Sequence, residues 1–204
     1  MTAGAFREVP YMGVIWVVHE ASKLGFRNGH PDWCNLGQGQ PEFGTMAGAP
    51  TRIASVRIRP EDHAYGPLGG IPELREAVAE HYNRLFRHGR KSRYTAANVC
   101  VAQGGRLALS RAFAALDKGR VGHQLPDYTA YEDLFNLHLG RLRSVAVRTR
   151  ERDGFILTPA DFAKAVSQGR LKAFLLSNPC NPTGAVIRGR DLAALVKTAR
   201  EKSC

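Results

Sequence analysis

The chain has 204 residues, of which 44% are hydrophobic and 23% are charged, as is ordinary for a globular protein with a buried core. Its 29 basic residues outnumber its 18 acidic ones and give a formal net charge of +11. The basic residues are spread along the whole chain, and no ladder of interleaved aromatic residues accompanies their densest group, so we expect no dedicated nucleic-acid site. The densest basic group, from Arg84 to Arg93, ends an expected helix, where positive charge suits the helix dipole.

Membrane and metal-binding classes are also disfavoured. The longest apolar run near the N-terminus, Tyr11 to Val18, is far shorter than a membrane span, and no small-residue cleavage site follows it. We therefore expect a cytoplasmic protein without a membrane segment. The four cysteines show neither a Cys-x-x-Cys nor a Cys/His spacing, so we expect no metal site and no disulfide scaffold: Cys34, Cys100, Cys180 and Cys204.

The first part of the chain predicts two helices separated by loops. Apolar side chains have helical spacing over residues 11–25, whereas residues 30–70 are rich in Gly and Pro. Pro72 then opens a helix at its favoured first-turn position, and Glu73 places negative charge at the positive end of the dipole. The apolar face expected for this helix is Leu74, Ala77, Val78, Tyr82 and Leu85.

From Asn98 onward, strand and helix patterns alternate. We expect strands at 99–102, 121–125, 144–147 and 171–176, and helices at 106–116, 129–139, 158–169 and 191–202. Thr158 is the expected N-cap of its helix, with Pro159 in the first turn. The repeated strand–helix units predict an α/β fold of three layers, α/β/α, with a mainly parallel sheet.

In such folds, ligands bind beyond the carboxyl ends of the strands, so the loops there are the candidate sites. Gln103 to Arg106 opens a helix with two glycines, which suits either a phosphate site or an ordinary tight turn. Tyr128 follows the second strand, where it suits either a planar ligand or the core. The segment Gly37 to Glu42 lacks the third glycine of a dinucleotide fingerprint and follows no clear strand, so we reject that interpretation.

The segment Ser177-Asn178-Pro179-Cys180-Asn181-Pro182-Thr183-Gly184 follows the fourth expected strand. Each proline disfavours helix at the preceding residue and donates no N–H, which keeps the backbone extended and turning. This geometry presents the side-chain amide of Asn181 at the edge of the sheet, where it can both donate and accept a hydrogen bond.

Five segments together resemble, in the same order, the class I/II aminotransferases, which are pyridoxal-phosphate enzymes of fold type I. They are Asn35–Glu42, Tyr65–Arg75, Gly104–Leu109, Pro126–Tyr128 and Ser177–Gly184. The resemblance covers nearly the whole chain from about residue 10. It implies an N-terminal arm and helix at 1–45, belonging to the small domain and dimer contact. Residues 46–204 would be the first, incomplete part of the large cofactor-binding domain.

The resemblance also implies a role for each matching residue. Asn181 would hydrogen-bond the phenolic oxygen of pyridoxal 5′-phosphate, and Tyr128 would stack on the ring. The backbone N–H groups of Gly105 and Arg106 would hold the phosphate. Tyr65 would reach the phosphate of the neighbouring subunit, which implies a homodimer. Gly39 would lie against the carboxylate of the substrate.

No catalytic residue is assigned, because the Schiff-base lysine, the acid at the ring nitrogen and the substrate-binding arginine of the family all lie beyond this Asn-Pro motif. None of the lysines here follows a strand in a suitable loop, so we expect no substitute among Lys23, Lys91, Lys118, Lys164, Lys172, Lys197 and Lys202. Cofactor binding by this chain is expected to be weak.

The resemblance implies a sheet that is truncated after its fourth strand. In the family's strand order, 3-2-4-5-6-7-1, this chain supplies strands 1 to 4. The strands at 144–147, 121–125 and 171–176 should then be adjacent in that order, while the strand at 99–102 loses its neighbour. Unpaired strand edges predict marginal stability or aggregation unless a partner covers them.

The leading hypothesis is the N-terminal part of an aminotransferase, which moves an amino group between an amino acid and a 2-oxo acid, inactive by itself. The alternative is a non-catalytic interaction protein of the same fold that pairs with an intact paralogue through the Tyr65 region. Nucleic-acid binding is a third hypothesis, which predicts retention on DNA that survives moderate salt.

Overall fold

The computed structural model describes residues 11, 13–39, 44–138 and 140–204. Residues 1–10 of the expected arm, and Gln40, Pro41 and Glu42 of the first motif, lie outside the described residues. The chain divides into two compact units. The larger one comprises residues 1–39 and 112–204, and the smaller one comprises residues 40–111. Along the chain, helix α3, Gly105–Ala115, crosses from the smaller unit into the larger one.

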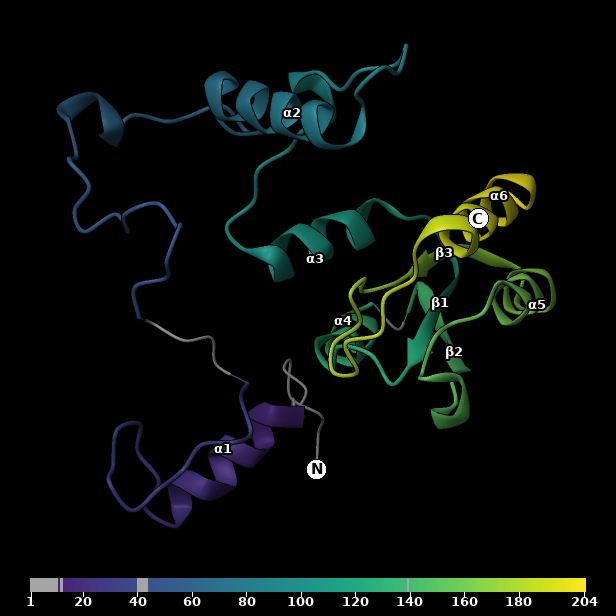
Figure 1. The fold of residues 1–204 in the computed structure, drawn as a ribbon, viewed down its shortest axis with the longest axis horizontal. Coiled ribbons are helices and arrows are strands. Elements are labelled where there is room, and N and C mark those ends of the chain that lie inside the picture. The colour runs from purple at the N-terminus through teal and green to yellow at the C-terminus, as the bar shows by residue number, and fades with distance from the viewer. Residues whose placement is uncertain (1–10, 12, 40–43, 139) are drawn as a thin grey trace, which may run out of the picture. The chain divides into compact units, whose positions relative to one another are not determined.

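The larger unit contains a parallel sheet of three strands, β1 Gly119–Leu125, β2 Leu142–Arg148 and β3 Leu171–Leu175 (Figure 1). Their order is β2-β1-β3, and β1 is hydrogen-bonded to both neighbours in parallel. This order confirms the adjacency predicted for the three strands. The central position of β1 explains why four successive residues of a strand with few large apolar side chains are buried.

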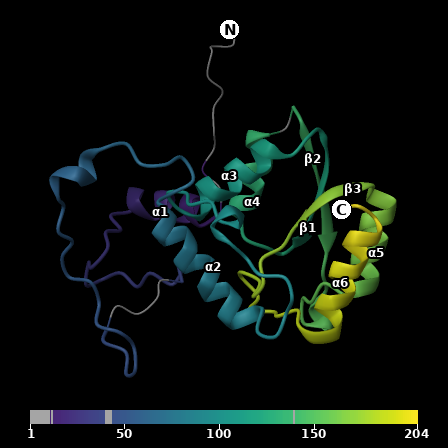
Figure 2. The same cartoon turned by 90° about the horizontal axis from the view of Figure 1, so that it is seen from above.

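Helices cover both faces of this sheet. Figures 1 and 2 show α4, Ala130–Leu137, on one face and α5, Pro159–Gly169, with α6, Gly189–Glu201, on the other. The predicted three-layer α/β/α arrangement with a parallel sheet is therefore confirmed. Helix α5 begins as expected, because the Thr158 side chain accepts the N–H of Asp161 at 3.1 Å.

The apolar core of the larger unit has a part on each face of the sheet. Between the sheet, α5 and α6, the buried side chains are Leu157, Phe162, Val166, Leu171, Ile187 and Leu195. On the α4 face, Phe113 and Phe135 meet edge to face, with their ring centroids 5.5 Å apart. The sheet is thus covered on both sides, as a parallel sheet requires.

Helix α1, Gly13–Lys23, confirms the helix predicted near the N-terminus. It has no buried residue, and its apolar side chains Ile15, Trp16 and Val17 are about half exposed. An ion pair of 2.7 Å joins Lys23 to Glu20 on its surface.

The smaller unit is built on α2, Pro72–Phe86, which begins at Pro72 as predicted. The Arg75 side chain donates to the carbonyl oxygens of Val99, at 2.8 Å, and Ala96, at 2.7 Å. Short 3₁₀ turns complete the described elements: η1 Pro60–His63 and η2 Ala96–Asn98 here, and η3 Glu151–Asp153 in the larger unit. The apolar stripe expected on α2 is not its buried face: Ala79 and Asn83 are buried, whereas Leu74, Tyr82 and Leu85 are about half exposed.

The predicted strand at 99–102 is wrong. These residues form no strand, and the N–H of Val101 instead donates to the carbonyl oxygen of Gly69 at 2.8 Å. Because no described strand of the smaller unit lies beside it, the segment has no ladder to join. It packs on Gly70, whose φ of +96° and closeness to the Val101 side chain both require glycine.

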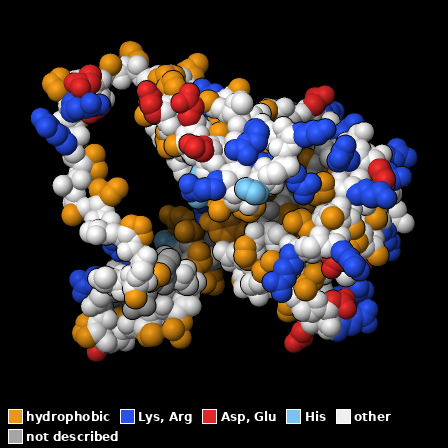
Figure 3. Space-filling view, turned by 45° about the horizontal axis from the view of Figure 1, so that its top comes forward, with side chains coloured by type: hydrophobic (Ala, Val, Ile, Leu, Met, Phe, Trp, Pro, Cys, Tyr) orange, Lys and Arg blue, Asp and Glu red, His pale blue; other side chains and the backbone are white. Residues whose placement is uncertain are grey.

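Lys and Arg side chains are scattered over the face shown in Figure 3, between acidic, apolar and other polar side chains. The positive charge visible on this face is therefore distributed, as the sequence predicted for the chain as a whole.

Gly122 leads to a stability prediction. It lies in β1, and a Cβ there would collide with the Phe174 ring and would lie 2.5 Å from Cδ1 of Leu171. We expect Gly122→Ala to lower the free energy of unfolding by about 1–3 kcal/mol, because the core must shift to accept the methyl group. Urea unfolding followed by circular dichroism measures this. Gly140→Ala is the matched control, since a Cβ at Gly140 meets nothing within 4 Å. Equal loss in both variants would contradict the packing described for Gly122.

Candidate functional site

Two of the predicted site residues stand on neighbouring loops of the larger unit. Strands β1 and β3 pair in parallel, with His123 opposite Leu175, so both chains leave the sheet at the same edge. Tyr128 follows β1 and Asn181 follows β3. This edge, at the carboxyl ends of parallel strands, is where open α/β sheets bind ligands.

A hydrogen bond between buried or half-buried side chains joins the two loops. The Ser177 hydroxyl donates to Oδ1 of Asp127, across 50 residues of sequence. The same carboxylate oxygen accepts the backbone N–H of Tyr128 at 2.8 Å. No role was predicted for Asp127 or Ser177, because neither their spacing nor their residue types indicate that the two side chains meet.

A second side-chain contact joins the end of β1 to the loop after β3. The Gln124 side chain is almost fully buried, and its Nε2 donates to Sγ of Cys180 at 2.8 Å and to the carbonyl oxygen of Pro126 at 3.3 Å. Cys180 is buried as well. The end of β1 therefore holds the loop after β3 by both a carboxylate and an amide.

The loop after β3 is also held by its own hydrogen bonds. The side chain of Asn178 accepts the N–H of Ile187 at 2.9 Å and donates to its carbonyl oxygen at 2.8 Å. The N–H of Gly184, whose φ is +71°, donates to the carbonyl oxygen of Cys180 at 2.7 Å. Asn181 itself is exposed. Its side chain thus extends from a backbone that is fixed on both sides, as the sequence predicted.

The end of β1 collects buried polar groups. Asp127 is 6% exposed, and within the described residues its Oδ2 has no hydrogen-bond partner. Burial raises the pKa of the Tyr131 phenol above its usual value of 10.0, the charge of Asp127 raises it further, and a hydrogen bond with Ser177 opposes both. Burial lowers the pKa of His123 below 6.5, although a bond to Gln124 and the charge of Asp127 act in the opposite direction.

The other predicted site residues lie elsewhere in the chain. Gly105 and Arg106 begin α3 in the smaller unit, at the positive end of the helix dipole. Tyr65, in the same unit, has a fully exposed side chain. Gly39, in the larger unit, has a φ of +56°, and no described atom lies within 4 Å of where its Cβ would be. Asn181 and Tyr128 are therefore the two predicted residues that neighbouring loops bring together.

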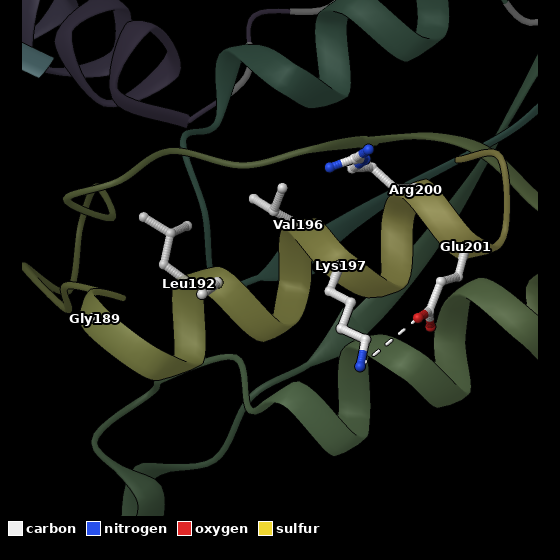
Figure 4. Close-up of a pocket in the computed structure, with 7 residues that line it drawn as sticks. Gly189, Leu192, Val196, Lys197, Arg200 and Glu201 are labelled. Carbon is white, nitrogen blue, oxygen red and sulfur yellow. Dashed lines mark ion pairs between the residues drawn. The ribbon is translucent and has the colours of Figure 1, made fainter. Parts of the chain in front are cut away.

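A hollow on the surface of α6 lies apart from these loops in the chain (Figure 4). Its walls come from one helix, and Lys197 and Glu201 form an ion pair of 3.8 Å at its rim. None of the predicted site residues lines it. We therefore locate the candidate site by the contacts between the loops after β1 and β3, and not by the hollow on α6.

The described residues also bear on membrane and metal binding. Among them, no helix is both long enough and apolar enough to cross a membrane. In the same part of the chain, no three His, Cys, Asp or Glu side chains are grouped so that they could hold a metal ion.

Comparison with known proteins assigns this fold and these loops to a family. The model of the family described as aminotransferase class I and II matches residues 31–204. The chain belongs to this aminotransferase family. An aspartate/prephenate aminotransferase of Cereibacter sphaeroides is 37% identical over 169 residues, covering 80% of this chain and 40% of that protein. The aspartate/prephenate aminotransferase of Thermus thermophilus is 33% identical over 187 residues, covering 91% of this chain and 46% of that protein.

Solved structures agree with this assignment to the aminotransferases. The aspartate aminotransferase of Thermus thermophilus, solved with maleate, superimposes with a TM-score of 0.59 and 34% identity, over 68% of this chain and 35% of that one. The alanine aminotransferase of Pyrococcus furiosus gives a TM-score of 0.59 and 30% identity, over 68% and 34%. This chain thus spans less than half the length of the aminotransferases that it matches here.

His123 gives this unit a pH dependence of known sign. Because the pKa of His123 is lowered in the folded state, this side chain is protonated near pH 6.5 in the unfolded chain but only at lower pH in the folded one. Stability is then complete above pH 6.5 and falls as the pH drops toward 5, by at most about 1.4 kcal/mol per pH unit. Urea midpoints between pH 7.5 and pH 5, at constant ionic strength, measure this slope. His123→Gln should flatten the slope, whereas His63→Gln, at an exposed position, should leave it unchanged; an unchanged slope in His123→Gln would contradict the assignment.

Proposed function

We propose that this chain forms one wall of the active site of a pyridoxal-phosphate-dependent aminotransferase. The observation that carries the proposal is that Tyr128 and Asn181 stand on two loops joined by the Asp127–Ser177 hydrogen bond at the ligand-binding edge of a parallel sheet. Membership of the aminotransferase family supports the choice of ligand.

The residues at this edge fit a flat, hydrogen-bonding ring. Tyr128 offers an aromatic face, and the exposed Asn181 amide can donate to a phenolic oxygen. Asp127, whose carboxylate joins the two loops, lies on the same wall.

We place the phosphate of the ligand at the start of α3. There Gly104 has a φ of +99°, and its carbonyl oxygen accepts the N–H of Ala108 at 3.1 Å, so it caps the helix. The backbone N–H groups of Gly105 and Arg106, which follow it in the first turn, lie at the positive end of the helix dipole, which suits an anion. This is the role predicted for both residues from the family resemblance, and it uses neither side chain.

The proposed reaction is the transfer of an amino group between an amino acid and a 2-oxo acid by the whole protein. Bound pyridoxal phosphate supplies the electron sink that this chemistry requires. The names of the relatives make aspartate the first amino donor to test. Gly39 remains the proposed neighbour of the substrate carboxylate.

We also propose a homodimer in which Tyr65 reaches the site of the neighbouring subunit. Its fully exposed side chain is available for such a contact. The same exposure would serve the alternative hypothesis, in which the chain pairs with a longer paralogue. Sedimentation velocity on the purified chain, alone and mixed with such a paralogue, separates the two, and a monomer under both conditions would contradict both.

Ligand binding tests the proposed wall directly. Pyridoxamine 5′-phosphate is the suitable probe, because its amine forms no imine with surface lysines. We expect the polypeptide Met1–Cys204 to bind it weakly, and Asn181→Ala and Tyr128→Ala each to weaken binding about tenfold, as the loss of one hydrogen bond or one stacked ring does. Tyr128→Phe should keep most of the affinity, since it keeps the ring. Probe fluorescence or calorimetry measures the dissociation constants.

Asn28→Ala is the control for this binding experiment, because it removes an exposed asparagine that does not belong to the Asn-Pro loop. Equal affinities of Asn181→Ala and the Asn28→Ala control would show that Asn181 does not contact the ligand.

The second test concerns catalysis. We propose that the polypeptide Met1–Cys204 alone does not transaminate, because none of its lysines stands in the loops after β1 and β3. After incubation with pyridoxal phosphate and borohydride, we expect low and scattered modification of surface lysines by peptide mass mapping, with no turnover of aspartate and 2-oxoglutarate. Stoichiometric labelling of one lysine together with turnover would overturn this part of the proposal.

A further inference from the structure

Ser177 is linked by hydrogen bonds to both candidate ring-binding residues, Tyr128 and Asn181. Its hydroxyl donates to Oδ1 of Asp127, and its oxygen lies 3.4 Å from the backbone nitrogen of Asn181, from which it accepts a hydrogen bond. A serine hydroxyl has one donor hydrogen and two acceptor lone pairs, so both contacts can exist together. The donated bond is the stronger one, because its acceptor is a carboxylate.

The same hydroxyl is connected to the backbone of Tyr128 through Asp127. Oδ1 of Asp127, which accepts from Ser177, also accepts the N–H of Tyr128 at 2.8 Å. The buried ring of Tyr131 meets the ring of Tyr128 edge to face, with the centroids 5.7 Å apart and the planes at 87°. Asp127 thus fixes the backbone of Tyr128, while Tyr131 supports its ring.

We propose that Ser177 is a positioning residue that holds Tyr128 and Asn181 in one fixed arrangement for the bound ring. This inference rests on the proposed function, and it adds a residue to which sequence analysis gave no role. Ser177 does not itself need to touch the ligand. It acts through the backbone of Asn181 on one side and through Asp127 on the other.

The loop after β3 should survive the loss of this hydroxyl. Gln124 still holds Cys180 through the bond of 2.8 Å, and Asn178 still holds the backbone of Ile187. We therefore expect Ser177→Ala to fold, with a loop that is attached but no longer fixed at Asn181. Ser177→Thr restores the hydroxyl and should restore the arrangement.

A double-mutant cycle distinguishes positioning from a merely structural role. In the polypeptide Met1–Cys204, Ser177→Ala should lower the affinity for pyridoxamine 5′-phosphate about five- to tenfold, and Ser177→Thr should stay within about twofold of the wild type. In an Asn181→Ala background, the same Ser177→Ala change should cost less affinity than it does in the wild type, because only its effect through Tyr128 remains. Equal losses in both backgrounds would overturn the proposal.

Thr158→Ala is the matched control for this cycle. Thr158 also donates its hydroxyl to an aspartate, Asp161, at 2.8 Å, but it does so at the start of α5. This variant should lower the urea midpoint without changing ligand affinity. An equal loss of affinity in Thr158→Ala and Ser177→Ala would assign the effect of Ser177 to stability alone and overturn the proposal.

Amide exchange tests the link without any ligand. In protein labelled with ¹⁵N-asparagine, the backbone signal of Asn181 is identified by its loss in Asn181→Ala. Ser177→Ala should speed its hydrogen exchange at least about tenfold, and Ser177→Thr should not. If the wild type binds no pyridoxamine phosphate, the proposed function fails, and this exchange rate still decides whether Ser177 holds Asn181. Unchanged exchange in Ser177→Ala would overturn the inference.

Discussion

The parallel pairing of β1 with both of its neighbours is the constraint on which the larger unit depends. Among the described strands, it makes β1 the one that is hydrogen-bonded along both edges. Such a position tolerates little side-chain volume, which accounts for Gly122 opposite Phe174. The pairing also brings the ends of β1 and β3 together, and so it sets where the loops after them can meet.

The buried end of β1 is more polar than packing alone requires. His123, Gln124 and Asp127 are each at most 6% exposed, and each would be costly to bury without partners. Gln124 is hydrogen-bonded to Cys180, and Asp127 to Ser177, both on the neighbouring loop. Oδ2 of Asp127 remains unpartnered among the described residues. A cluster of buried polar groups that lowers the stability of the fold is more typical of a functional site than of a structural core. The aminotransferase family gives that site its expected ligand.

Much of the larger unit could be predicted, because hydrophobic periodicity and helix caps are local signals. Helix α5 illustrates this, since Thr158 and Pro159 mark its start in the sequence and in the structure. The order of the strands came from resemblance to a family, not from periodicity. The prediction of a strand at 99–102 was wrong because apolar residues form a strand only where a neighbouring strand can pair with them. This dependence on distant residues makes strands hard to predict.

The candidate site was predictable to a lesser degree. The Asn-Pro motif indicated Asn181, because the restriction that proline imposes on the backbone is local and can be predicted from the sequence. The contacts of Ser177 with Asp127 and of Cys180 with Gln124 could not be predicted, since they join residues 50 and 56 positions apart and depend on the register of two strands. Gly105, Arg106 and Tyr65 belong to the smaller unit, and their roles stay predictions.

We expect Asn181 to face the bound ligand, and the side-chain amide signal of Asn181 tests this most directly. In ¹⁵N-asparagine-labelled protein titrated with pyridoxamine 5′-phosphate, we expect a saturable shift of that NH₂ signal, the one lost in Asn181→Ala, while the signal of Asn28 stays in place. A titration that saturates while the Asn181 signal does not move would contradict the claim.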